Sequence, residues 1–472
     1  MIEQGRNMKK NLILILGGFL LSIYNGAIAQ NYGSWKIISS LNIPRAYHSS
    51  TVLPNGNILV TGSTGSPNFL SSCEIYDTLL KTWRYINPMN TGRSHHKAIL
   101  LNNGKVLVVG GFMIRSCELF DPINETWVFT DSLIIKRSFD LTVSLLNDGN
   151  VLVTGGRAYS DDFSYSMILN NCEIYNVGIG LWKPTDTLKI ARTMHTATVL
   201  LDGRVLVTGG FGKNHKYLNS CEIYDPTTGA WAFVDSLNIA RRGHSATLLT
   251  NGRVLVAGGR NDPYSWLRSC EVYDPQSNTW TLVDSMIFPR EGHSGILVLD
   301  SVILFSGGGM NSTTWELYNA NNFTPLYLEL LPFYKIIHDI LPLPNDKVIS
   351  IGGWVRSGIA IYPTDTCLIY DYNLTSVKLE NNETPILFDL FQNYPNPFNA
   401  HTIITYQIPE KEFISIKIFN SLGEELLKLD EGIKEPGTYN ISLNGSKLST
   451  GVYYCRLNSR NYSKTIKMLI IK

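Results

Sequence analysis

Apolar and polar positions follow one pattern that returns along most of the chain. Residues 91–111, 191–210 and 240–259 each contain an arginine, a histidine, a short strand-like stretch, an Asn-Gly or Asp-Gly dipeptide and an apolar run closed by two glycines. The dipeptides allow the positive φ of a tight hairpin. Apolar runs such as "VLVAGG" indicate strands covered on both faces. The pattern therefore predicts hairpins of buried strands.

Each unit continues with a variable loop, a segment such as "SCEVYD", a turn and a strand that opens with tryptophan. Four antiparallel strands that return about every 50 residues are typical of propeller blades. The second glycine position marks seven units, at Ser63 (a serine in place of glycine), Gly111, Gly156, Gly210, Gly259, Gly308 and Gly353. We therefore predict an all-β fold whose main part is a seven-bladed β-propeller.

The way the ring closes is open to two interpretations. The segment that begins at Trp35, "WKIISSLNIPR", matches the last strand of another unit, "WTLVDSMIFPR". Residues 377–382 could fill the same place in the seventh unit. We expect the Trp35 strand to join the seventh unit, with residues 377–382 as an exit linker, because closure removes an exposed sheet edge.

The repeated units resemble the Kelch repeat family. The resemblance rests on the glycine pairs, on the "CEIYD" or "CEVYD" segments and on the tryptophans Trp83, Trp127, Trp182, Trp231 and Trp280. It implies a propeller over residues 31–380. This chain departs from the pattern at Ser63, Pro325, Lys335, Asp346 and Val377.

The chain ends change the picture from one domain to an exported protein with two. Three basic residues, a 13-residue apolar run at 12–24 and Ala27-Ile28-Ala29 predict a signal peptide over residues 1–29, cleaved between Ala29 and Gln30. No later segment is apolar enough for a membrane helix. Lysine plus arginine (40) nearly equals aspartate plus glutamate (39), which argues against a nucleic-acid surface.

After a linker at residues 381–387, period-two alternation over residues 388–472 predicts a small immunoglobulin-like β-sandwich. This tail resembles the C-terminal sorting domain of the type IX secretion system. The matching segments include "GTYNISLNG", "LSTGVYYCRL" and the motif Tyr394, Pro395, Asn396, Pro397, Phe398 and Asn399. The resemblance implies handling by the type IX machinery and a secreted or outer-membrane surface location. The alternative is that the sandwich is a stalk or adhesion module.

Six cysteines and six histidines occupy equivalent places in the units. We expect the cysteines to be small buried side chains without disulfides, because equivalent positions in adjacent blades lie too far apart. The histidines are His48, His96, His195, His244, His293 and His338, and Asp140 fills this place in the third unit. We expect them to bond neighbouring blades, because a catalytic site needs different residue types at one point.

One basic residue leads each unit: Arg45, Arg93, Arg137, Arg192, Arg241, Arg290 and Lys335. Two interpretations are open. As a ring at the channel mouth these residues would attract an anionic ligand. As structural donors they would bond carbonyls or carboxylates.

Function is expected in the loops that differ between units, because variable loops on a rigid scaffold carry most binding sites. The candidate ligand-binding residues are Arg157, Tyr159, Asp161, Asp162, Tyr165, His215, Tyr264, Trp266, Trp354 and Arg356. Aromatic rings mixed with Asp, Asn and Arg suit a sugar or a peptide.

The sequence thus favours an exported, monomeric binding protein for an extracellular protein or glycan, with no cofactor, metal site, catalytic residue or nucleic-acid partner. One alternative is a secreted carbohydrate-active enzyme, because some Kelch-like propellers are sugar oxidases (galactose-oxidase-like) or sugar isomerases. Another is a purely structural surface component that self-associates. The chain shows no nucleophile–base pair, phosphate loop or HExxH motif.

Overall fold

The computed structural model describes residues 34–64, 69–308, 314–330, 335–336, 339–343, 347–357, 360–371, 388–390, 393, 396, 398, 401–445, 448–460 and 462–470. The chain divides into two compact units, Met1–Leu374 and Thr375–Lys472. Several predictions lie outside the described residues: the signal peptide with Ala29 and Gln30, the linkers at 377–382 and 381–387, His338, and Tyr394, Pro395, Pro397 and Asn399. These, and the domain boundaries, stay predictions.

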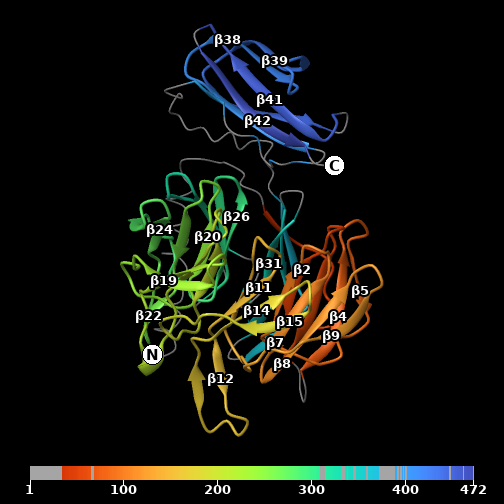
Figure 1. The fold of residues 1–472 in the computed structure, drawn as a ribbon, viewed down its shortest axis with the longest axis vertical. Coiled ribbons are helices and arrows are strands. Elements are labelled where there is room, and N and C mark those ends of the chain that lie inside the picture. Colours follow the sequence, from red (N-terminus) through yellow and green to blue (C-terminus); the bar gives the residue numbers. More distant parts are fainter. Residues whose placement is uncertain are drawn as a thin grey trace, which may run out of the picture. The chain divides into compact units, whose positions relative to one another are not determined.

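The first unit is built from seven four-stranded antiparallel sheets within the described residues (Figure 1). We number these sheets as blades 1 to 7. Blades 1 to 3 contain β2 (Ser49–Val52), β3 (Ile58–Ser63), β4 (Leu70–Asp77) and β5 (Thr82–Ile86); β6 (Lys97–Leu100), β7 (Val106–Gly111), β8 (Ile114–Asp121) and β9 (Thr126–Thr130); and β10 (Thr142–Leu145), β11 (Val151–Thr154), β14 (Cys172–Asn176) and β15 (Leu181–Pro184).

The later blades repeat this order. Blades 4 to 6 contain β16 (Thr196–Val199), β17 (Val205–Thr208), β18 (Cys221–Asp225) and β19 (Ala230–Val234); β20 (Ser245–Leu248), β21 (Val254–Ala257), β24 (Cys270–Asp274) and β25 (Thr279–Val283); and β26 (Ser294–Leu299), β27 (Val302–Ser306), β28 (Thr314–Asn319) and β29 (Pro325–Leu330). Blade 7 contains β31 (Asp339–Pro342), β32 (Val348–Ile351), β35 (Cys367–Asp371) and β1 (Ser34–Ile37).

The ring closes through the N-terminal strand. β1 pairs with β35, and Trp35 lies opposite Tyr370. The first strands of neighbouring blades contact one another around the whole ring, including β2 against β31. The prediction that the Trp35 strand completes the seventh unit is therefore confirmed, and the first unit is a seven-bladed propeller whose ring is closed by β1.

Short elements decorate the loops between second and third strands. β12 (Arg157–Tyr159) and β13 (Ser166–Ile168) form a ribbon that stands out from the blades (Figure 1). β22 (Arg260–Asp262) pairs with β23 (Ser265–Trp266), and a 3₁₀ turn covers Lys213–His215. In blade 7, β33 (Trp354–Ser357) pairs with β30 (Lys335–Ile336) and β34 (Ala360–Pro363).

The second unit is an immunoglobulin-like β-sandwich, as the alternating pattern predicts. One sheet has the order β36 (Asp389–Leu390), β37 (His401–Ile408), β40 (Gly437–Asn444), and the other has the order β39 (Glu425–Lys434), β38 (Glu412–Phe419), β41 (Gly451–Asn458), β42 (Ser463–Ile470). Phe398 of the sorting motif joins the buried core with Tyr406 and Cys455. Asn396 accepts a hydrogen bond from the Leu469 amide and so fixes the start of the domain to its last strand.

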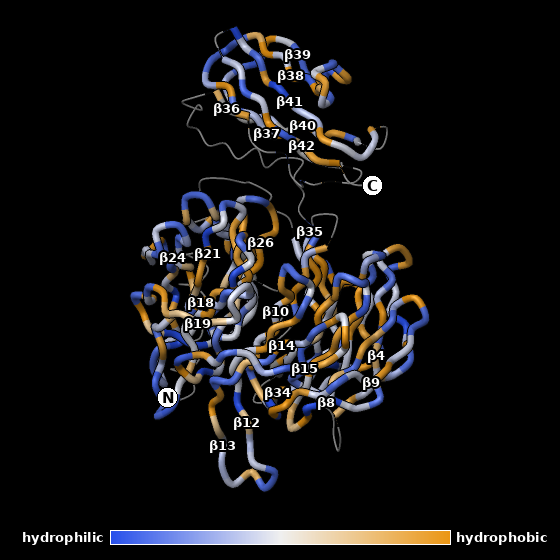
Figure 2. Tube along the Cα trace, viewed as in Figure 1, coloured by the Kyte–Doolittle hydropathy of each residue, from blue (hydrophilic) through white to orange (hydrophobic). Residues whose placement is uncertain are grey.

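Burial follows the repeat. Apolar residues run along the strands of the blades, and hydrophilic residues are more frequent in the connections (Figure 2). The six repeated cysteines are free and buried, as predicted, and Cys455 of the second unit is also free and buried. Burial raises the pKa of Cys73, Cys172, Cys221 and Cys270 to about 12, so these thiols are protonated at neutral pH and chemically quiet.

The six arginines that the sequence suggested for a basic ring are fully buried, each with 0 % exposure. Every one is ion-paired with a buried glutamate on the third main strand of its own blade: Glu74, Glu118, Glu173, Glu222, Glu271 and Glu316. The channel-mouth interpretation is therefore wrong for these arginines, because no charge is left to face a ligand. Lys335 lies on β30.

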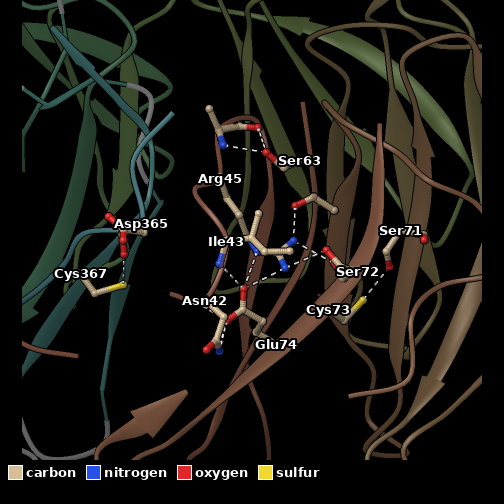
Figure 3. Close-up of polar contacts among 12 residues, drawn as sticks. Asn42, Ile43, Arg45, Ser63, Ser71, Ser72, Cys73, Glu74, Asp365 and Cys367 are labelled. Atoms are coloured by element: carbon tan, nitrogen blue, oxygen red, sulfur yellow. Dashed lines mark hydrogen bonds and ion pairs between the residues drawn. The ribbon is translucent and has the colours of Figure 1, made fainter. Parts of the chain in front are cut away.

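The Arg45 site shows how the pair fastens a blade (Figure 3). Glu74 accepts hydrogen bonds from the backbone amides of Asn42 and Ile43, and from the Arg45 guanidinium at 3.0 and 3.1 Å. Arg45 also donates to the carbonyl oxygens of Gly62 and Ser72. One carboxylate thus holds both the arginine and the segment that enters the blade.

The same arginine residues join adjacent blades through their backbone. The amides of Gly210, Gly259 and Gly353 donate to the carbonyl oxygens of Arg241, Arg290 and Arg45 at 2.7 to 2.8 Å. A Cβ on the first glycine of a pair would collide with this carbonyl: at Gly258 it would lie 2.7 Å from the oxygen of Arg290. The paired glycines therefore let the next blade approach, as expected.

The repeated histidines cross the same boundary. His96, His195, His244 and His293 are buried, and their Nε2 atoms lie 2.8 to 2.9 Å from hydroxyl oxygens of the preceding blade, on Thr61, Thr154, Thr208 and Ser245. His48 lies 3.8 Å from Asp339 of blade 7. The scaffold interpretation is confirmed for the described histidines, but the partners are side chains rather than backbone.

The glutamate of the buried pair should be essential for stability. Glu271→Gln keeps the shape of the side chain but leaves the Arg241 charge buried without a counter-ion. We expect the free energy of unfolding to fall by about 3–5 kcal/mol, measured by urea unfolding followed through tryptophan fluorescence. The control is Glu125→Gln, which removes a partly exposed pair with Arg84 and should cost about 1 kcal/mol or less. Equal losses would contradict the buried pair's role.

The buried histidines should also make stability depend on pH. Burial lowers the pKa of His195 and His293 to about 3, whereas an unfolded histidine titrates at about 6.5. Below pH 6.5 the unfolded chain therefore binds protons that the folded chain does not, and stability falls as the pH falls.

We expect His195→Gln to flatten this dependence between pH 6.5 and 4. The difference in slope should approach one proton, or about 1.4 kcal/mol per pH unit. Urea unfolding of both proteins at several pH values measures it. The carboxylates are common to both proteins, so identical slopes would refute the assignment to His195.

Candidate functional site

Two kinds of connection meet at one end of the blades. Lead-in segments precede the first strand of each blade, and the other connections join second and third strands. Isolated β-bridges tie the two kinds together: Arg45 with Thr364, Phe139 with Arg157, Thr193 with Phe211, and Arg242 with Arg260. We call this end the loop face, and it carries the residues that the sequence suggests for binding.

The ribbon carries several of these residues outward. Asp161 pairs with Lys136, and Asp162 accepts hydrogen bonds from Ser164. Hydrogen bonds from neighbouring serines lower the pKa of Asp162 to about 2. The Tyr165 side chain is 63 % exposed. These groups are occupied with the turn itself or lie in solvent, and they do not converge on one point.

The other predicted residues are of two kinds, those that are exposed and those that pack against neighbouring side chains. Tyr264 is 89 % exposed, and His215 touches only the ring of Phe211 among the described rings. In contrast, Tyr159 packs on Phe112 and Phe139, and Trp354 meets the ring of Tyr47. Trp266 lies beneath the Arg260 guanidinium. Arg157 starts β12, and Arg356 lies on β33.

A set of positions that the sequence reading missed lies between these loops. In blades 1 to 6 one residue of the lead-in segment has a positive φ, between 53° and 66°: Tyr47, His95, Asp140, Met194, Gly243 and Gly292. Backbone hydrogen bonds join neighbours in this series, from His95 to Tyr47, from Gly243 to Met194 and from Gly292 to Gly243. We call these six the mouth positions, because they precede the innermost strands and follow one another around the ring.

The placement of Asp140 corrects a prediction. Strand pairing puts Thr142 opposite Thr154, just as Thr196 lies opposite Thr208. The residue equivalent to His195 is therefore Leu141, and Asp140 occupies a mouth position. The third unit has one extra residue after Arg137, so counting from the arginine gave the wrong equivalence. The residue that precedes each repeated histidine differs from unit to unit. This variation was the sequence signal that could have revealed the mouth positions.

Aromatic rings form a continuous arc over one half of the mouth. Tyr47 and His95 stack with ring centres 3.8 Å apart. Trp354 meets Tyr47 edge to face, and Phe139 meets His95 edge to face. Phe112 and Tyr159 extend the arc into the loops of blades 2 and 3. We call this set the aromatic arc.

Charged groups border the other half. The Glu291 carboxylate lies 3.2 Å from Arg242 Nε and 3.5 Å from Arg260 Nη1. The Arg242 guanidinium also covers the rings of Phe211 and Tyr217 at 4.8 and 5.3 Å. These cation–π contacts hold the guanidinium plane in one orientation.

Three residues at the mouth positions have shifted pKa values. Burial raises the pKa of Asp140, although the residue remains solvent-accessible. Four neighbouring groups oppose this rise: Lys97, the Thr193 hydroxyl, Arg157 and Arg242. Burial, with the nearby Asp140 charge, raises the pKa of Tyr47. Burial lowers the pKa of His95 to about 4, so this ring is neutral at physiological pH. The mouth is thus a partly desolvated place in which polar contacts are strengthened.

A depression of 330 Å³ also lies on the loop face, at blades 3 and 4. Its lining residues are Asn170, Lys189, Ile190, Ala191, Gly212, Lys213, Lys216 and Leu218. None of these is a predicted site residue or part of the aromatic arc.

Comparison with protein families gives matches in both units of the chain. Residues 136–324 match the KLHDC2/KLHL20/DRC7 Kelch-repeats domain, and residues 44–90 match the Kelch motif. Residues 392–472 match the secretion system C-terminal sorting domain. No curated protein matches the chain. Among the described residues, the structure has no helix with the length and hydrophobicity to cross a membrane.

Many solved structures share the fold. One is described as a novel fungal alcohol oxidase with catalytic diversity among the AA5 family, in complex with copper. It aligns with a TM-score of 0.60 at 13 % sequence identity, over 93 % of this chain and 100 % of that chain. At this identity the similarity concerns the fold alone.

In the described part of the chain, the histidines and cysteines do not gather into a metal site. Among the described residues, no three His, Cys, Asp or Glu side chains are grouped so that they could share a metal ion. His244 is buried against a threonine, and the cysteines are buried with raised pKa values. Copper needs imidazole or thiolate ligands that converge, and here the repeated histidines and cysteines are distributed around the ring.

Proposed function

Because the chain is a Kelch-repeat propeller protein that ends in a type IX sorting domain, we propose that it is an extracellular binding protein. The sorting domain indicates secretion or attachment to the cell surface and handling by the type IX machinery. On the propeller, an extracellular protein or glycan binds at the loop face, around the aromatic arc.

The observation that carries the proposal is the contrast between repeated and individual residues. The repeated arginines, glutamates and described histidines are buried and engaged in holding the ring. The mouth positions differ from blade to blade and bring Tyr47, His95 and Trp354 together at the loop face. Partly exposed aromatic rings beside fixed charges are typical of binding surfaces.

The predicted ligand-binding residues have different roles in the proposed site. Tyr159, Trp266 and Trp354 belong to the arc or to its charged border and are proposed to contact the ligand. Arg157 and Arg356 start or lie on the strands that carry these residues. Asp161, Asp162, Tyr165, His215 and Tyr264 are proposed to form an outer rim.

We favour binding over the enzyme alternative. Among the described residues, no three His, Cys, Asp or Glu side chains are grouped so that they could hold a metal ion. Stoichiometric copper in the purified protein, together with oxidase turnover, would replace the binding proposal with the enzymatic one.

Binding should depend on the loop face and not on the opposite end of the blades. Trp354→Ala and Tyr159→Ala should each raise the Kd for an extracellular ligand about tenfold or more, because buried aromatic contacts dominate binding energy. Binding of the purified chain to panels of glycans and of extracellular proteins is measured by biolayer interferometry.

The control is Asn251→Asp, in a hairpin turn between β20 and β21 at the opposite end. It should leave the Kd unchanged. If no saturable ligand emerges, or if the control weakens binding as much as Trp354→Ala, the proposed site is refuted. Self-association of the purified protein without any ligand would favour the purely structural alternative over the expected monomer.

A further inference from the structure

The side chains at the mouth of the propeller differ from one half to the other, and this difference points to one class of ligand. Blades 1 to 3 place Tyr47, His95 and Asp140 at the mouth positions, whereas blades 5 and 6 have Gly243 and Gly292. Among the described residues, a Cβ on Gly292 would have no atom within 4 Å. A Cβ on Gly243 would lie 2.9 Å from the Glu291 side chain. As far as the described residues show, the mouth therefore has large side chains in blades 1 to 3 and two glycines, bordered by Glu291, in blades 5 and 6.

Arg242 is held so that one edge stays free. Its Nε donates to Glu291, and its flat face lies over Phe211 and Tyr217. Among the hydrogen bonds between described residues, neither Nη group of Arg242 is a donor. A guanidinium with two free parallel N–H groups in a fixed plane is suited to a ligand that offers two oxygen acceptors.

Asp140 supplies the complementary acceptor. Its carboxylate accepts a hydrogen bond from the Thr193 hydroxyl at 3.3 Å and lies within electrostatic reach of Arg242. A ligand between Asp140 and Arg242 must donate to one and accept from the other. A hydroxyl group does both. A carboxylate ligand would gain from Arg242 but would be repelled by Asp140 and Glu291.

Several backbone amides of the mouth are not free to pair with a peptide strand. The amides of His95, Gly243 and Gly292 are already bonded to the neighbouring mouth position. Those of Thr193 and Arg242 are bonded to the loops. An extended peptide binds largely through free main-chain groups of a sheet edge, so these five bonded amides disfavour that mode. Aromatic rings and charged side chains are the groups that remain for recognition.

From these contacts we propose that the mouth binds a neutral sugar ring. Its hydroxyls bridge Asp140 and Arg242 over the Gly243–Gly292 side, and its apolar face rests against the aromatic arc. The inference rests on the proposed function, because it names the ligand class of the same loop-face site. Asp140 and Arg242 are the residues that select for hydroxyl groups.

The test uses the purified full-length chain and three kinds of probe. The first is a set of neutral oligosaccharides of glucose, mannose, galactose and xylose. The second is galacturonic acid oligomers, and the third is a library of peptides. Isothermal titration calorimetry gives the Kd for each. We expect saturable binding of at least one neutral oligosaccharide and weaker binding of the acidic ones.

Three variants locate the sugar. Asp140→Asn and Arg242→Lys should each raise the Kd about tenfold or more, because each removes a hydrogen bond to a charged group. Gly292→Asn places a side chain on the Gly243–Gly292 side, and asparagine tolerates the positive φ of that position, so it should block binding. Asn251→Asp, in the hairpin turn between β20 and β21 at the opposite end of the blades, is the control and should leave the Kd unchanged. Unfolding midpoints within a few degrees of the parent confirm that all four fold.

The outcomes separate this inference from the proposed function. Binding of a peptide or of acidic sugars alone, lost in Trp354→Ala, would overturn the sugar proposal and leave a loop-face binding protein. Sugar binding that survives Asp140→Asn and Arg242→Lys would overturn the assignment of these residues. Absence of any ligand in all three panels would count against both.

Discussion

The propeller depends on one residue that acts in two blades at once. Each repeated arginine donates through its guanidinium to a buried glutamate and to carbonyl oxygens of its own blade. In at least four cases its own carbonyl oxygen accepts a hydrogen bond from the glycine pair of the preceding blade, as Arg241 does from Gly210. A blade cannot separate from the preceding blade without breaking one of these two connections. A buried charge also tolerates no loss of its counter-ion, so the arginine, the glutamate and the glycine pair form a linked set.

This arrangement explains why the repeat contains so little functional information. The repeated arginines, glutamates and described histidines hold the blades and the ring together, and their side chains are buried. The mouth positions are under a weaker constraint, because only the positive φ is shared among them. Tyrosine, histidine, aspartate, methionine and glycine all occur there. The mouth positions, whose residues differ in chemical type from blade to blade, therefore lie near the axis of the loop face rather than at the exposed tips of the longest loops.

The fold could be predicted because its signals are local and repeated. Asn-Gly turns, glycine pairs and apolar runs each specify a hairpin or a close approach, and seven copies specify the ring, including the contribution of Trp35 from the chain start. The fate of the arginines was left open, because sequence does not reveal that Glu271, thirty residues away, meets Arg241. The ligand site stays a prediction: Tyr165 and Tyr264 were selected for their loop composition, whereas the residues of the mouth positions were not selected. The stacking of Tyr47 on His95 joins two blades and leaves no local pattern.

The third blade shows how such a scaffold can acquire a distinctive group without losing stability. In blades 2, 4, 5 and 6 a histidine bonds a hydroxyl of the preceding blade, as His195 does with Thr154. At the boundary of blades 2 and 3 both partners are apolar: Val109 replaces the hydroxyl residue, Leu141 replaces the histidine, and both are buried in one cluster. Exchanging both members of a buried polar pair for well-packed apolar groups is close to neutral in free energy. Once that bond is absent, the lead-in segment can hold one more residue, and the extra length brings the carboxylate of Asp140 to the mouth.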